Sequence, residues 1–444
     1  MTLDSTAAAT PENVAHLFRR AAFVGTPDEI EEGVEQGIEA TVDWLFDHRR
    51  AEPVIEPKRH VGGIPYEPLE LDAWLIGQAV HSPTPAIERL MWFWIGHFPV
   101  GLDKVEQSDL LFRFWAVLRR HGLGRFDSLL SHVTHDGAMN IWLDLHGSIA
   151  GNPNENFSRE LMELFSLGAG NGYTEADVRE GARALTGYSV DYDIATGVPL
   201  GGRFRPELHD HGTKTFLGRS GRFDADDVLS IVTQRPESHR FIASRVWHRF
   251  AGTLMPADVE AVLVSAFARR LRVDDLLQAM LTHPRFYAAG VRHGLVAHPV
   301  ETMVRTIRGF DLPFLSPGTD PDASNTTERS LELTESLLRM GQVPTSPPNV
   351  SGWPHNSSWL DSNRSAARLL VGTEIGTWLD ELPVGAELRS VAHRPAHLAA
   401  ALMQRFGRIR WSPATEAAIG AAAHTESIAA AFAVAFTSPE VVLS

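Results

Sequence analysis

The segment 152–168, NPNENFSRELMELFSLG, carries a dense set of side chains capable of chemistry. On a helical wheel Arg159, Glu160 and Glu163 fall on one face, and the apolar residues fall on another. Two carboxylates three residues apart beside a guanidinium would hold a divalent cation, or would orient a water molecule with one carboxylate as general base. The alternative is a solvated face, because Glu155 and Arg159 have the i, i+4 spacing of a surface ion pair.

A histidine ends the apolar stretch 90–98, LMWFWIGHF. Burial on so apolar a helix would depress the pKa of His97, so the ring is expected to be neutral. It would then either ligate a metal ion or form hydrogen bonds as a satisfied core histidine.

The stretch HDHGTK, 209–214, lies in the least helical part of the sequence. His209 and Asp210 could supply an imidazole and a carboxylate to a metal ion, and Lys214 could bind an anionic group. The alternative is a polar turn in which Asp210 and Gly212 serve the backbone geometry. Farther along, Trp353 lies between a glycine and a proline, where it would line a pocket or pin its loop to the core.

Composition excludes several classes of chemistry. The chain has 444 residues and no cysteine, which excludes disulfides, thiolate metal sites and a cysteine nucleophile. The formal net charge is -15, which disfavours binding to nucleic acid or to anionic membranes. No stretch is long and apolar enough to suggest a membrane span, and the start of the chain lacks the pattern of an export signal. We therefore expect a cytoplasmic protein. The spacing of zinc proteases, the P-loop and the Gly-x-Ser-x-Gly elbow are absent.

These groups must be positioned by helices, because the sequence predicts a mainly α fold. Apolar residues recur at helical spacing through most of the chain, and residues 90–95 are apolar all round the wheel, as in a fully buried helix. Alternating residues and glycines in 187–218 favour a small β-hairpin or an irregular excursion. We expect one helical unit over 1–444. A sub-boundary at 311–328, rich in Pro, Ser, Asp and Thr, would separate a core (11–310) from a C-terminal part (329–444).

Taken together, the motifs resemble the bacterial family catalogued as domain of unknown function 1800. The resemblance is carried by His16-Leu17-x-x-Arg20 with Gly25, Trp92-Phe93-Trp94 ending His97-Phe98, Pro153-Asn154-Glu155-Asn156 with Arg159-Glu160-Leu161-x-Glu163-Leu164, Tyr173-Thr174, Ala184-Leu185-Thr186-Gly187, His209-Asp210 with Lys214, and Gly352-Trp353-Pro354. The resemblance implies no agreed activity. Many members of the family look exported, and this chain departs from them in its start. Members are often encoded beside a protein of the domain of unknown function 1501 family, which implies a protein partner by analogy.

The polar residues in the motifs that carry the resemblance lead to the hypothesis that this protein is an enzyme. Its metal ligands would be His97, Glu160, Glu163 and His209, holding a divalent ion. Its catalytic residues would be Glu160, Glu163, His209 and Asp210, with Asp210 orienting His209. Its substrate-binding residues would be Arg159, Lys214 and Trp353. Metal-dependent hydrolysis of an anionic or carbonyl substrate would fit this set. The alternative is a non-catalytic binding or accessory protein in which the same residues form a structural salt-bridge network.

Overall fold

The computed structural model describes residues 6–56, 67–193, 199–318, 325–425 and 427–443, and helices dominate it as the sequence predicts. The first third contains α1 (Pro11–Ala21), α2 (Pro27–Gln36), α3 (Ile38–Leu45), α4 (Pro68–His81), α5 (Pro85–His97), α6 (Leu102–Val105), α7 (Ser108–His121), α8 (Phe126–His135) and α9 (Gly137–Trp142). The middle contains α10 (Asn156–Glu160), the π-helical segment η3 (Leu161–Ser166), α11 (Glu175–Ala184), α12 (Ala225–Thr233), α13 (Pro236–Ala251), α14 (Ala257–Ala268), α15 (Val273–Thr282), α16 (Ala289–Arg292) and α17 (Pro299–Gly309). The last part contains α18 (Asn325–Met340), α19 (Ser362–Leu379), α20 (Pro383–Ala392), α21 (Pro395–Arg405), α22 (Pro413–Thr425), α23 (Ile428–Thr437) and α24 (Pro439–Val442).

Helix starts follow the capping chemistry of the sequence. The hydroxyl of Thr10 accepts a hydrogen bond from the backbone N–H of Asn13, and Pro11 occupies the first helical position. Thr174 and Asp177 form a reciprocal capping box at the start of α11. Local sequence therefore sets where these helices begin.

Two short antiparallel hairpins interrupt the helices. β1 (Tyr188–Tyr192) pairs with β2 (Pro199–Phe204), and β3 (Lys214–Phe216) pairs with β4 (Arg219–Gly221). The predicted small β excursion near 187–218 is thus confirmed.

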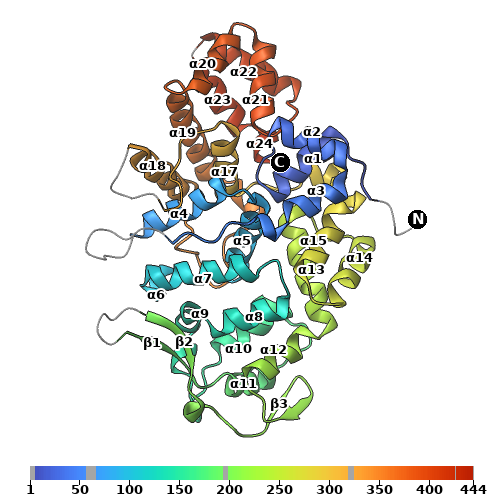
Figure 1. The fold of residues 1–444 in the computed structure, drawn as a ribbon, viewed down its shortest axis with the longest axis vertical. Helices are drawn as coiled ribbons and strands as arrows, with labels where there is room; N and C mark the ends of the chain where they lie inside the picture. The colour runs from blue at the N-terminus through green and yellow to red at the C-terminus, as the bar shows by residue number, and fades with distance from the viewer. Residues whose placement is uncertain (1–5, 57–66, 194–198, 319–324, 426, 444) are drawn as a thin grey trace.

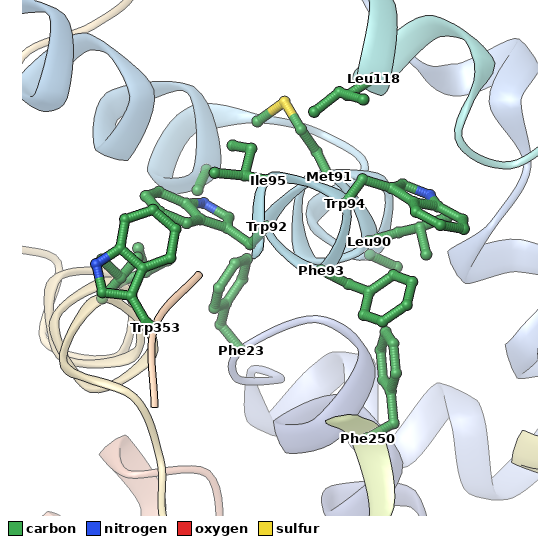
Figure 2. Close-up of a cluster of buried hydrophobic side chains, with 14 of the residues drawn as sticks. Phe23, Leu90, Met91, Trp92, Phe93, Trp94, Ile95, Leu118, Phe250 and Trp353 are labelled. Atoms are coloured by element: carbon green, nitrogen blue, oxygen red, sulfur yellow. The ribbon is translucent and has the colours of Figure 1, made fainter. Parts of the chain in front are cut away.

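Helix α5 lies near the centre of the molecule, where it packs against α4 and α7 (Figure 1). Leu90, Met91, Trp92, Phe93, Trp94 and Ile95 are all buried, which confirms the prediction of a helix covered on every side. Figure 2 shows Trp92 directed toward Trp353 on one side of α5, whereas Trp94 points to the opposite side. The indole N–H of Trp94 donates to the carbonyl of Gly122 at 2.9 Å. The core around α5 is therefore both apolar and specifically oriented.

The loop 343–361 is held firmly against α5. Gly352 has a φ of +77°, and a Cβ there would lie 2.6 Å from the carbonyl oxygen of Gly96, so only glycine fits without movement. The amide of Asn356 donates to the carbonyls of Gly252 and Gly294, at 2.8 and 3.0 Å, and accepts from the N–H of Val296. These contacts place Trp353 on the core.

Buried apolar residues from Val14 to Val442 form one continuous cluster. The sub-boundary expected at 311–328 includes residues 319–324, which lie outside the described residues. Within the described part of the chain, no helix combines the length and the apolar character that crossing a bilayer requires.

Candidate functional site

The predicted carboxylate face lies on α10 and η3. Arg159 pairs with Glu175 at 2.6 Å and with Glu155 at 3.3 Å, all at least one-third exposed. Burial and the neighbouring charge of Glu163 raise the pKa of Glu160. Arg159 is thus engaged by carboxylates on the surface, as in the solvated-face alternative.

His97 makes a contact typical of a core histidine. Its Nε2 lies 3.1 Å from the carbonyl oxygen of Phe165, to which it donates. Burial, together with the charge of Arg245, lowers the pKa of His97 to about 3. The ring is therefore neutral at physiological pH, as expected, with Nδ1 deprotonated.

The HDHGTK segment is folded into backbone contacts. Nδ1 of His209 lies 3.0 Å from the carbonyl oxygen of Thr186. The His209 ring is therefore oriented by Thr186, which has the role that was predicted for Asp210. The carboxylate of Asp210 instead pairs with Arg183 at 2.8 Å. The buried ammonium of Lys214 donates to the carbonyls of Asp210, Gly212 and Phe223. All three of its N–H groups are used, which leaves Lys214 in a structural role.

The predicted metal ligands His97, Glu160, Glu163 and His209 are not gathered into one site. Across the described ranges, no three or more His, Asp or Glu side chains are arranged to hold a metal ion. The residues present therefore do not fit a divalent cation of the kind the enzyme hypothesis invokes, and no metal-dependent step follows from this structure.

A different set of polar groups does converge. A pocket lies between α5, α13, the start of α17 and the loop 343–361, with an interior space of about 20 Å³, enough for a water-sized group. Trp353, predicted to bind substrate, is the member of the sequence-derived set that lines it. The lining residues are Trp92, Phe93, Gly96, Arg245, His248, Arg249, His298, Gln342, Trp353 and His355.

Arg249, which lines the pocket, belongs to a buried ion-pair cluster. Glu301 accepts from Arg89 at 3.0 Å and forms a second, closer pair with Arg249. Burial alone would raise the pKa of Glu301, but the charges of Arg249 and Arg89 outweigh it and hold that pKa well below its usual range. Arg245 makes no ion pair within the described ranges. Two guanidinium groups therefore pair with this carboxylate, and the buried Arg20 and Arg305 also lie within electrostatic reach of it.

Three histidines, His248, His298 and His355, line the same pocket. The ring centroid of His355 lies 5.7 Å from that of His298 and 5.8 Å from that of His248. Burial, and then the charges of Arg249 and Arg245, lower the pKa of His355 to about 3. Burial also lowers the pKa values of His298 and His248. All three imidazoles are therefore neutral in the absence of a ligand.

Several side-chain nitrogen atoms at this pocket have no hydrogen-bond partner in the described protein. They are the indole N–H groups of Trp92 and Trp353, Nη1 of Arg249, Nε of Arg245, and Nε2 of His298 and of His355. Trp92, Arg249, His298 and Trp353 are only 4–6% exposed. Unpaired buried donors cost about 1–3 kcal/mol each, so a ligand that accepts hydrogen bonds would be favoured here.

Local sequence explains why α13 and α17 place these side chains at the pocket. Arg245, His248 and Arg249 follow the i, i+3, i+4 spacing that places them on one face of α13. His298 is the N-cap of α17 and forms its capping box with Glu301, whose carboxylate accepts from the backbone N–H of His298 at 3.3 Å. Because Nε2 of His298 is without a partner, the cap uses Nδ1, and the neutral ring carries its proton on Nε2.

The buried carboxyl group of Asp72 anchors the loop 343–361. Asp72 accepts from the N–H of Thr345 at 2.8 Å and lies 3.0 Å from its hydroxyl. Burial raises the pKa of Asp72 to about 8, so the group is protonated in the folded protein at neutral pH. The anchor of the loop is thus a neutral carboxylic acid.

Replacing Asp72 with asparagine should remove a pH-dependent loss of stability. The unfolded pKa of Asp is about 3.8, so the folded wild type binds one more proton between about pH 4 and pH 8, and its stability falls as the pH rises through that window. Asparagine mimics the protonated acid and never ionises. Urea unfolding should show D72N gaining at least about 2 kcal/mol over wild type between pH 5 and pH 8. An equal pH dependence in both proteins would contradict the assignment.

The fold and the pocket define a mainly helical protein with a buried, cationic, donor-lined cavity. The chain belongs to the DUF1800 family, because the model of that family, described as a protein of unknown function, matches residues 16–443. No curated protein and no solved structure matches the chain.

Proposed function

We propose that this protein binds a small anionic molecule in the pocket between α5, α13, α17 and the loop 343–361. The observation that carries the proposal is the set of buried, unpartnered N–H groups on Arg249, Trp92, Trp353 and His298. Indole and guanidinium groups only donate hydrogen bonds. A ligand that satisfies them must therefore present acceptors, and an anion presents the strongest ones.

Electrostatics supports the same ligand class. Arg245 and Arg249 line the pocket, and Glu301 pairs with Arg249 but not with Arg245. Charge in a poorly solvated site is costly unless it is paired, so an anion in the pocket would relieve this cost. The start of α17 adds the positive end of a helix dipole. The acidic surface of the protein makes this internal cationic site distinctive, since its net charge is -15.

Acid–base catalysis on the bound molecule is the second candidate function. The observation that favours it is the group of neutral imidazoles at the same pocket, from His248, His298 and His355. A neutral imidazole accepts a proton, and a positioned general base typically contributes 10²–10⁴-fold to a rate. Hydrolysis of an anionic or carbonyl substrate is thus proposed at this pocket without a metal step.

In this proposal the polar residues of α10 and of the 209–214 segment have a structural role, which the sequence analysis gave as the alternative to an enzyme site. Arg159 and Asp210 are ion-paired, and Lys214 is bonded to backbone carbonyls. These contacts fix segments of the fold rather than bind substrate.

Substituting Arg245 with methionine is expected to weaken anion binding at least tenfold. The change removes one charge and one unpartnered N–H from the pocket, whereas the stem volume is largely kept. The matched control is Arg240→Met on the same helix, whose guanidinium is exposed and paired with Glu260. Isothermal titration with small carboxylates, phosphate and sulfate at constant ionic strength measures the difference. If no anion binds, or if both variants bind like wild type, the proposal is wrong.

A further inference from the structure

We infer that the groove between α18 and α19 binds an amphipathic helix of a partner protein, one whose apolar face is flanked by lysine or arginine. The groove has a volume of about 590 Å³ and is lined by these two helices and by Glu381, just beyond the end of α19. The two helices lie side by side at the left of the molecule in Figure 1. The groove shares no lining residue with the pocket of the proposed function, so binding here is independent of anion binding.

Two ion pairs cross from one helix to the other and mark the length of the groove. Arg339 pairs with Glu374 at 2.6 Å, and Arg329 lies 3.7 Å from Glu381. Because lower residue numbers on α18 meet higher ones on α19, the two helices run antiparallel. The lining residues of α18 run from Arg329 to Arg339, a distance of about 15 Å at 1.5 Å per residue. This length accommodates about three turns of a third helix packed along the first two.

The floor of the groove is apolar and buried. Leu333 on α18, together with Ile375 and Trp378 on α19, lines the groove, and each is at most 9% exposed. A tryptophan offers a partner a large apolar contact, and tryptophan is frequent among the residues that dominate binding energy. Other faces of the two helices are occupied, because α18 packs on α4 and α19 packs on α23. The groove is therefore the side of this helix pair that is open to solvent.

Leucines are exposed at the end of the groove where Arg339 meets Glu374. Leu338 precedes Arg339, and Leu369 and Leu370 lie about one turn before Glu374. These three leucines are 51–57% exposed. Single exposed leucines are ordinary, but a group of them on two adjoining helices marks a surface that another apolar surface covers. An amphipathic helix, with apolar residues at i, i+3, i+4 and i+7, matches such a surface.

The charge of the groove selects a basic partner. Four glutamates and two arginines line it, which leaves an excess of two negative charges. Lysine or arginine beside the apolar face of a bound helix would complement this excess, whereas glutamate or aspartate would be repelled. A second copy of this chain would bring the same carboxylates and a net charge of -15 to the contact. The charge therefore favours a different protein as the partner.

Fluorescence anisotropy with a synthetic helix tests this ligand class. The probe is a labelled peptide of about 14 residues, with leucines at the i, i+3, i+4, i+7 spacing and lysine or alanine elsewhere. The full chain should bind it at least tenfold more tightly than a matched peptide in which glutamate replaces lysine. Equal affinity for the two peptides, or binding of neither, would overturn this inference and leave the proposed anion pocket standing.

Two variants locate the binding at the groove. Leu370→Gln removes exposed apolar surface and should weaken binding of the lysine peptide about tenfold. The matched control is Leu254→Gln, because Leu254 is 87% exposed and lies between α13 and α14, outside the groove. Equal affinity of the two variants would reveal a non-specific attraction to an acidic protein and would overturn the inference. A thermal unfolding curve of each variant confirms that folded proteins are compared.

Sedimentation velocity without peptide tests the other occupant, a second copy of the chain. Leu370→Gln should leave the sedimentation coefficient of the protein unchanged. A wild-type dimer that the L370Q variant loses would show that this groove pairs two copies, and it would overturn the inference of a basic partner helix.

Discussion

Replacing Glu301 with glutamine is expected to lower the free energy of unfolding by about 3–5 kcal/mol. The side chain is 4% exposed and is the carboxylate shared by Arg89 and Arg249. Glutamine keeps the shape but removes the charge, which leaves two guanidinium groups buried without a counter-ion. The expected loss of stability is large, because the substitution breaks the buried ion pairs with Arg89 and Arg249.

Urea unfolding of the E301Q variant measures this loss. The control is Glu374→Gln, because Glu374 pairs with Arg339 at 2.6 Å but is half-exposed. Solvent screens that pair, so its loss should cost less than about 1 kcal/mol. Equal losses in the two variants would show that the Glu301 cluster does not carry buried charge.

Sulfate affinity is expected to rise about tenfold or more as the pH falls from 7 to 4.5. The pKa of His355 is about 3 without a ligand, because the ring is buried beside Arg249 and Arg245. A bound anion favours the protonated ring and raises that pKa, so binding takes up a proton over the interval between the two values. Each unit by which the ligand raises the pKa strengthens binding up to tenfold on the acidic side. Sulfate suits the measurement because its own charge stays constant over this range.

Two variants separate His355 from other titrating groups. His355→Gln should flatten the pH dependence of sulfate affinity, because glutamine does not titrate. His132→Gln, at an exposed position on α8, should leave it unchanged. An affinity that is independent of pH in the wild type, or a dependence that survives in the H355Q variant, would contradict the proposed role of His355.

The local features of the fold could be predicted because they depend on neighbours in sequence. The capping box of Thr174 and Asp177, the hairpin of β1 and β2, and the complete burial of Trp92 and Trp94 all follow from short-range patterns. The hairpin and the burial of the aromatic helix were predicted above, and the structure confirms both.

The pocket could not be predicted in the same way, because it is assembled from distant elements. Trp353 was expected to line a pocket, but its partners come from α5, α13 and α17. One signal was present in the sequence, namely Arg245, His248 and Arg249 on one face of a helix. A second was the His298-Pro-x-Glu301 pattern, in which a helix cap also carries charge. Neither pattern reveals that the groups converge.

The polar motif of 152–163 shows a second limit of prediction from sequence, because its pattern is visible locally but its contacts depend on the rest of the fold. Its spacing left a cation site and a solvated face open. In the structure Arg159 is held by Glu155, as in the solvated-face alternative, and by Glu175, which lies outside the motif. Similarly, the backbone carbonyls that accept from Lys214 become available only through the fold of the 209–223 region. Residue types and spacing indicate which reactions or ligands the side chains could support. Tertiary contacts determine whether those side chains are already engaged by other protein groups.

The most direct test of the anion pocket is a crystal structure of the full chain grown in sodium bromide. Bromide is a single-atom anion that scatters anomalously, so it reports the site without assuming the shape of the natural ligand. We expect an anomalous peak within hydrogen-bonding distance of Arg249 and His298, beneath Trp353. Peaks confined to exposed arginines such as Arg240, with water or no density in the pocket, would contradict the account.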